Sequence, residues 1–109
     1  MEARAEERLL RLVGLGVRAR GAVVGVEQVR EAAKKGKLAL AIVAADASVH
    51  SAAKVVPLLE ARRIEIVRVA SAVGLGRAVG REQTAAVGIV DRQLARGMRE
   101  AMVSAPDRG

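Results

Sequence analysis

An unbroken apolar segment of strand length, residues 38–45 (LALAIVAA), lies near the middle of the 109-residue chain. Such a run is typical of a strand that is buried on both faces, as in a sheet covered by helices on both sides. Segments of helical periodicity alternate with shorter β-prone segments on either side of it. We therefore expect one α/β domain over residues 1–109, folded as a three-layer α/β/α sandwich with a mixed central sheet of about four strands.

Cap residues and glycines suggest where these elements begin and end. Helices are expected over residues 3–18, 26–35, 48–63, 72–79 and 92–103, and further strands at 22–24 and 64–70 and within 83–91. Ser71 and Asp91 are suited to cap the last two helices, and Asp46 or Ser48 the third. Pro57 predicts a kink or a break in that third helix, and residues 104–109 are expected to form a frayed tail.

The composition excludes several kinds of site and indicates the charge of the partner. The chain carries a net charge of +7 and contains no Cys, Phe, Tyr or Trp. It therefore has no disulfide framework or thiolate metal site, and it cannot stack bases on aromatic rings as RRM and OB-fold modules do. A folded domain with this positive excess predicts a polyanionic partner, most often nucleic acid. The alternative is an incidental basic surface that results from high-GC coding.

The chain also lacks the signals of membrane insertion or export. No run of about 18 apolar residues is present, so no transmembrane helix is expected. The acidic first residues, MEARAEE, do not match a signal peptide. We expect a cytoplasmic location and no membrane partner.

Two patterns in the sequence bear on catalysis and nucleotide binding. Residues 74–80 (GLGRAVG) follow an expected strand, but their GxGxxxG spacing departs from the usual GxGxxG, and no GxxxxGK[ST] loop is present. Asp46 and His50 lie four residues apart after a strand, without a nucleophile or a metal-ligand set, so a helix cap and a solvated histidine are the favoured interpretation. We expect no catalytic residue, metal or cofactor.

Basic residues gather in two parts of the sequence. Arg77 and Arg81 belong to the glycine-rich segment, and the others surround the expected helix 26–35: Arg18, Arg20, Arg30, Lys34, Lys35 and Lys37. If both parts lie at one edge of the sandwich, they form a single surface for an anionic ligand, and the helix start at residues 25–28 adds backbone N–H groups for phosphate. The alternative is a solvated face on which Glu31 pairs with Lys34 or Lys35.

Several stretches in the same order resemble the ribosomal protein family of the large-subunit seven-Ae and thirty-e proteins, in its bacterial-type form. They are residues 10–21 (LRLVGLGVRARG), 25–36 (GVEQVREAAKKG), 42–48 (IVAADAS), 57–60 (PLLE), 75–80 (LGRAVG) and the strand in 85–91. The resemblance covers about residues 8–91 and leaves a C-terminal helix at about 91–103. It implies the same α/β/α sandwich and a non-catalytic, ribosome-associated protein of translation that binds kink-turn-like or other structured RNA in ribonucleoprotein particles.

The resemblance also implies which residues contact the RNA. They are Gly25, Glu27, Gln28, Lys34, Lys35, Ser48, Arg81 and Gln83. Gly25 and the helix N–H groups would approach the backbone, Gln28 would read a base edge, and Lys34, Lys35 and Arg81 would hold phosphate, with polar loop contacts from Ser48 and Gln83. The chain departs from the family at Val23, Val24 and Glu31, where cations are expected, and at Glu27, which implies altered selectivity.

Two other functions remain open from the sequence. The first is a protein-interaction adaptor on the same scaffold, which the missing cations permit. The second is a small nucleotide-binding enzyme that would use Asp46 and the turn at residues 74–80.

Overall fold

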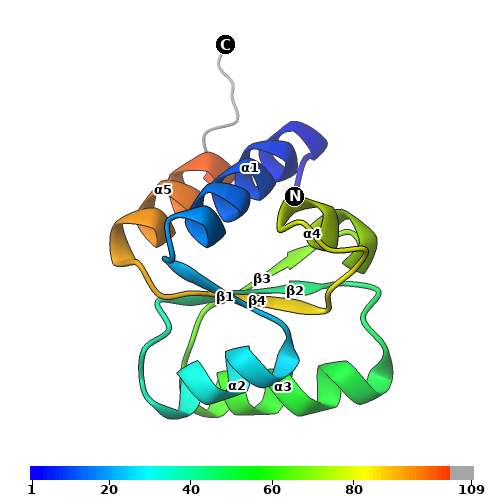
Figure 1. Ribbon diagram of the computed structural model, residues 1–109, viewed down its shortest axis with the longest axis vertical. Coiled ribbons are helices and arrows are strands. Elements are labelled where there is room, and N and C mark those ends of the chain that lie inside the picture. The colour runs from blue at the N-terminus through cyan, green and yellow to red at the C-terminus, as the bar shows by residue number, and fades with distance from the viewer. Residues whose placement is uncertain (104–109) are drawn as a thin grey trace.

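The chain folds into alternating helices and strands (Figure 1). The computed structural model describes residues 1–103, and the expected tail at 104–109 lies outside the described residues. Within them, no helix is both long and apolar enough to cross a membrane. The elements are α1 (Ala3–Arg18), β1 (Ala22–Val24), α2 (Val26–Lys34), β2 (Leu40–Ala44), α3 (Val49–Ala61), β3 (Ile66–Val69), α4 (Ala72–Ala78), β4 (Ala86–Ile89) and α5 (Arg92–Val103).

The four strands form one mixed sheet in the order β1-β4-β2-β3. Strand β4 runs antiparallel to both of its neighbours, whereas β2 and β3 are parallel. Helices α1, α4 and α5 cover one face of the sheet, and α2 and α3 cover the other (Figure 1). The predicted three-layer sandwich with a mixed four-stranded sheet is confirmed.

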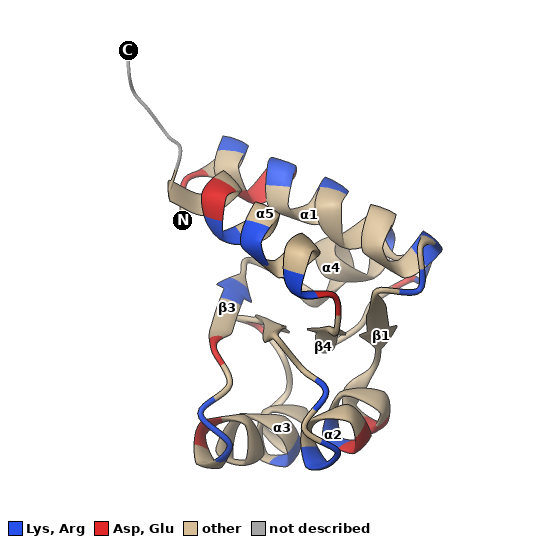
Figure 2. Cartoon of the chain, turned by 90° about the vertical axis from the view of Figure 1, so that its left-hand side faces the viewer, with Lys and Arg blue, Asp and Glu red and all other residues tan. Residues whose placement is uncertain are grey.

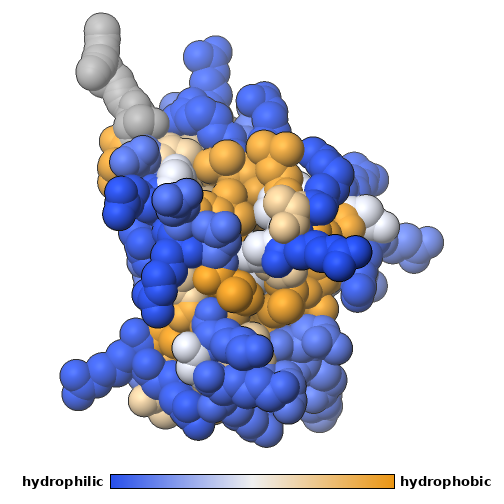
Figure 3. Space-filling model, turned by 60° about the vertical axis from the view of Figure 1, so that its left-hand side comes forward, coloured by the Kyte–Doolittle hydropathy of each residue, from blue (hydrophilic) through white to orange (hydrophobic). Residues whose placement is uncertain are grey.

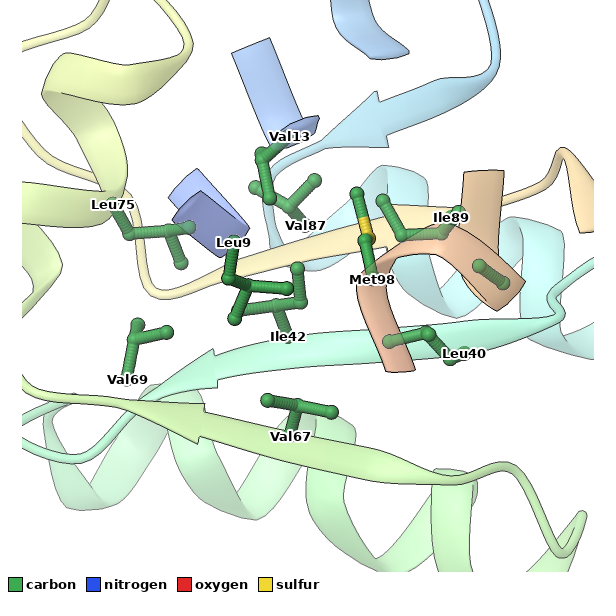
Figure 4. Close-up of a cluster of buried hydrophobic side chains, with 11 residues drawn as sticks. Leu9, Val13, Leu40, Ile42, Val67, Val69, Leu75, Val87, Ile89 and Met98 are labelled. Carbon is green, nitrogen blue, oxygen red and sulfur yellow. The ribbon is translucent and has the colours of Figure 1, made fainter. Parts of the chain in front are cut away.

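Strand β2 explains why residues 38–45 are apolar without interruption. All five of its residues are buried. Because side chains alternate along a strand, Leu40 and Ile42 enter the core beneath α1, α4 and α5, while Ala41 and Val43 enter the core against α2 and α3. Figure 4 shows the first core, in which Met98 of α5 joins side chains from the sheet, α1 and α4. Figure 3 shows apolar residues at the surface across the middle and upper part of one face, with hydrophilic residues over the lower layer and around the sides.

The expected caps are present, but the break at Pro57 is not. Ser48 Oγ accepts from Ser51 N at 3.0 Å, and Ser71 Oγ accepts from Gly74 N at 2.9 Å. Asp91 Oδ1 accepts from Leu94 N at 3.0 Å. Helix α3 continues through Pro57 as one element. Both Pro57 and Ala53, whose carbonyl loses its helical partner to the proline, are exposed, so water can satisfy the free carbonyl.

Four helices end in the same turn, but two of them do so without glycine. After α2 and α4 the left-handed position is taken by Gly36 and Gly80, with φ of 69° and 80°. After α1 and α3 it is taken by Arg20 and Arg63, with φ of 62° and 57°. Each turn is closed by a bond from the next residue to a carbonyl five residues earlier, such as Ile64 N to Leu59 O at 2.9 Å. The two arginines therefore occupy a conformation that favours glycine.

This geometry predicts the effect of glycine at either position. We expect Arg20→Gly and Arg63→Gly each to leave the free energy of unfolding unchanged or to raise it by up to about 1 kcal/mol. A side chain in the left-handed region costs about 1–2 kcal/mol, and the greater freedom of glycine in the unfolded chain offsets about 0.5–1 kcal/mol of that gain. Chemical denaturation measures the difference. A loss above about 1 kcal/mol in either variant would contradict the expectation.

Candidate functional site

Four chain segments meet at one edge of the sheet, where β1, β2 and β3 end and β4 begins. Gly25 N donates to Ala86 O at 2.9 Å, and Ala44 N donates to Ala85 O at 2.9 Å. Ala45 N donates to Val69 O at 2.7 Å, which adds the end of β3. We call this the site edge: the start of α2 at residues 25–28, the loops at residues 45–48 and 70–71, and the loop at residues 79–85.

Gly25 sets how α2 begins at the site edge. It is the N-cap, its φ of 99° and ψ of 155° belong to a region used almost only by glycine, and no side chain caps the helix. The first-turn N–H groups of this helix therefore receive no side-chain acceptor, and they carry the positive end of the helix dipole. Glu27 and Gln28 follow in the first turn and are exposed. This arrangement presents both backbone donors and an amide side chain.

Arg81 lies beside this helix start. A Cβ built on Gly25 would lie 3.8 Å from Arg81 Nη1. The loop that carries Arg81 is held by two backbone bonds, from Arg81 N to Gly76 O at 2.8 Å and from Thr84 N to Ala72 O at 3.0 Å. Gln83 belongs to the same loop and is exposed. The structure thus brings a guanidinium, backbone donors and polar side chains together, which is the chemistry that holds phosphate and base edges.

Ser48 and Asp46 hold the second loop of the site edge. Ser48 is exposed, and its Oγ accepts the cap bond of α3, so its hydroxyl hydrogen and one lone pair are left for a ligand. Asp46 Oδ1 accepts from Ala72 N at 2.7 Å and joins this loop to the start of α4. Asp46 therefore caps α4 rather than α3, a contact that only the packing of the two loops creates.

The same bonds weigh against the nucleotide-binding alternative. In the segment 74–80 the N–H of Gly74 is bonded to Ser71 Oγ, and Ala72 N to Asp46, so the first turn of α4 already has protein acceptors. His50 is exposed in α3. Among the described residues, no group of three or more His, Cys, Asp or Glu could hold a metal ion.

Lys54 lies next to the site edge and was not among the contact residues predicted from the sequence. Lys54, on α3, pairs with Glu27 at 3.4 Å, and both side chains are exposed. Arg30 Nη1 donates to Lys54 O and so links α2 to α3. No sequence signal marks Lys54, because its position beside Glu27 follows from the packing of α2 against α3. Lys54 supplies a cation beside the carboxylate that stands at a predicted contact position.

Lys34 and Lys35 do not lie with the other predicted contact residues. They end α2, nine residues long, and so stand about 13 Å along the helix from Gly25. Arg62 of the α3 end reaches them, donating from Nη1 to Lys34 O at 3.1 Å. The single basic surface considered from the sequence is therefore divided between the two ends of the sheet.

The comparisons with known proteins match this architecture. The model of the ribosomal protein L7Ae/L30e/S12e/Gadd45 family matches residues 7–101. A protein of unknown function from Bacillus halodurans C is 31% identical over 86% of this chain and 95% of its own, with a TM-score of 0.78. The 15.5kD RNA binding protein of Giardia lamblia is 24% identical over 94% of this chain and 88% of its own, with a TM-score of 0.80, which shows the shared fold.

A search of the curated proteins found no significant match. The family model, however, spans all of the described helices and strands apart from the first residues of α1 and the last residues of α5. The chain therefore belongs to the ribosomal protein L7Ae/L30e/S12e/Gadd45 family.

Proposed function

We propose that this chain is a non-catalytic RNA-binding protein that recognises kink-turn-like or other structured RNA and associates with the ribosome. The observation that carries the proposal is the meeting of the uncapped start of α2 with Arg81 at the site edge. Membership in a ribosomal protein family and a neighbour of the same fold whose name states RNA binding support it. The proposal assigns RNA binding to one domain over residues 1–109, in the cytoplasm.

Each residue of the site edge has a separate part in this proposal. The N–H groups of the first turn of α2 and Arg81 hold phosphate, and Gly25 allows the backbone of the RNA to come close. Gln28 reads a base edge, because its amide offers both a donor and an acceptor. Ser48 and Gln83 contribute polar contacts from their loops. Glu27, paired with Lys54, orders the first turn without adding net negative charge.

Three residues make the selectivity of this chain differ from that of relatives with cations at the same positions. Val23 and Val24 lie in β1 and pack against the core. As valines, they offer no charge to RNA. Glu31 is exposed one turn after Gln28 and repels phosphate. We therefore propose that this protein binds bent RNA with a weakened preference over plain duplex. The similarity to the Bacillus halodurans protein supports the proposal that this chain is a bacterial-type member of the family.

Charge reversal at Arg81 tests the proposal. We expect Arg81→Glu to weaken binding to a kink-turn RNA by about tenfold or more, because a phosphate contact becomes a repulsion beside Gly25. Fluorescence anisotropy over a salt series measures both the affinity and its salt dependence. Because the side chain of Arg81 is exposed, the variant should remain folded. Thermal unfolding of the variant checks this.

Arg77→Glu is the matched control, because it makes the same charge change four residues earlier, at a position within α4. Arg77 lines the groove between α1 and α4, away from the start of α2. It should lower affinity much less than Arg81→Glu. Wild-type protein that fails to bind any structured RNA at low salt would refute the proposal. Equal losses in the two variants would remove Arg81 from the site. A protein partner that survives nuclease treatment would instead favour the adaptor function.

A further inference from the structure

A second group of cations lies at the end of the sheet opposite the site edge. Helices α1, α2 and α3 all end there, immediately before β1, β2 and β3 begin. Val90 N donates to Gly21 O at 2.8 Å, Ala39 N to Ile89 O at 2.7 Å, and Ala41 N to Glu65 O at 2.9 Å, so the three turns lie side by side. Their cations, which we call the second basic surface, are Arg20, Lys34, Lys35, Lys37 and Arg63.

These cations are exposed and take part in no ion pair. The ion pairs among residues 1–103 are Lys54–Glu27 and Arg99–Glu65, and neither includes the second basic surface. Arg62, in contrast, is used within the fold, since it donates to Ala33 O and Lys34 O. Figure 2 views this end of the molecule and shows basic positions at the turns of both helical layers. The charge of the surface is therefore available to a ligand.

Two of the cations, Arg20 and Arg63, occupy backbone conformations that favour glycine. Arg20 and Arg63 have left-handed φ values, while the equivalent turns after α2 and α4 use glycine. Residues held in sparsely populated backbone conformations cluster at active sites, ligand clamps and switch regions. An exposed arginine at each of these turns adds charge at a conformational cost, and that favours a role in binding.

The strand starts that follow these turns are spaced closely enough for their cations to contact consecutive phosphates of a duplex. Neighbouring strands lie about 4.8 Å apart, and β4 stands between β1 and β2. The starts of β1 and β2, which follow the turns at Arg20 and Lys37, are therefore about 10 Å apart, and the start of β3, which follows the turn at Arg63, is about 5 Å from that of β2. Double-stranded DNA carries one phosphate per strand about every 3.4 Å along its helix axis, so a stem of similar charge density presents several phosphates over this length.

We propose that the second basic surface binds the phosphate backbone of a stem next to the RNA element held at the site edge, so that the protein bridges two RNA segments. This inference rests on the proposed function. Helix α3, of 13 residues, separates the two ends by about 20 Å, too far for one nucleotide to reach both. The second basic surface consists of Lys and Arg side chains at the turns and contains no Asn or Gln that could read a base edge. It therefore adds affinity for RNA without sequence preference.

The test varies the RNA and the protein together. The probes are a kink-turn RNA cut close to its bend and the same RNA with one stem lengthened. The wild-type protein should bind the longer RNA about tenfold more tightly near 100 mM salt, with a steeper salt dependence. Arg20→Gly/Arg63→Gly should lose most of this gain and reduce the slope of log K against log salt by about 2, while its affinity for the short RNA stays unchanged.

Two further variants separate charge from conformation. Arg20→Lys/Arg63→Lys keeps both charges and should keep most of the gain from the longer stem. Arg4→Gln/Arg11→Gln removes the same charge from exposed positions on α1 and should behave as wild type. Glycine is chosen for the main variant because its conformation suits both turns, so the fold is retained.

The outcomes distinguish this inference from the proposed function. If the short RNA binds in an Arg81-dependent way but lengthening the stem adds nothing, or if Arg20→Gly/Arg63→Gly keeps the full gain, the second basic surface is not an RNA surface and only this inference fails. If the wild-type protein binds neither RNA, the proposed function fails and this inference fails with it.

Discussion

Gly76→Ala should lower the free energy of unfolding by about 3 kcal/mol, and it should weaken any binding at the site edge. A Cβ at this position would lie 2.3 Å from Gln83 Cα and 2.6 Å from Gln83 N. These are backbone atoms of the loop that carries Arg81, so the clash cannot be relieved by turning a side chain. Forcing an extra carbon into a packed interior costs about 1–3 kcal/mol, and backbone contacts this short place Gly76 at the upper end.

Gly97→Ala is the control, because Gly97 is also helical but nothing lies within 4 Å of its Cβ position. In the interior of α5, alanine should raise the free energy of unfolding by about 0.5–1 kcal/mol, since it loses less backbone freedom on folding. Urea denaturation of the two variants beside wild type measures both effects. Equal stabilities of Gly76→Ala and wild type would mean that α4 does not pack on the loop at 79–85 as described.

Met98→Ala should lower the free energy of unfolding by about 2–5 kcal/mol. Met98 is fully buried and packs in the core cluster with Leu9, Leu40 and Ile89, which come from α1, β2 and β4. Truncation removes apolar surface from the core and leaves a cavity that the neighbouring side chains fill only in part. Because α5 follows the segment on which the family resemblance was based, this variant tests whether the last helix folds cooperatively with the rest.

Val103→Ala provides the comparison on the same helix. Val103 is 80% exposed, so its truncation should change the free energy of unfolding by no more than about 0.5 kcal/mol. Differential scanning calorimetry should show one transition for wild type and for both variants, with only Met98→Ala moved to a lower temperature. A separate early transition in the Met98→Ala protein would instead indicate that α5 unfolds on its own.

Much of the fold could be predicted because its signals are local. The run at residues 38–45 indicates a strand buried on both faces, and all of β2 is buried. Ser71 and Asp91 indicate the starts of α4 and α5 through side-chain acceptors three residues before the N–H they bond. The break that Pro57 could cause does not occur, because the helix-breaking signal of proline is local whereas the tolerance of α3 depends on which of its sides faces water.

The candidate site could be predicted only in part. Gly25, Gln28, Ser48, Arg81 and Gln83 belong to segments that meet at the site edge. Lys34 and Lys35 follow them closely in the sequence but stand at the other end of α2, because a helix advances by about 1.5 Å per residue and carries its last turn away from its first. Proximity along the chain makes Asp46 an alternative to Ser48 as the cap of α3, whereas its side chain accepts from Ala72 N of α4.

By itself, the sequence determined the order of the elements, the layers they form and the family to which they belong, since periodicity, caps and glycines act over a few residues. Only the tertiary structure decided that Arg81 comes within reach of Gly25, that Lys54 stands beside Glu27, and that the basic residues divide between two ends of the sheet. The first relation depends on strand order, in which β4 enters between β1 and β2. The other two depend on the packing of α2 against α3 and on the length of α2, and no signal local to these residues encodes either of the packing arrangements.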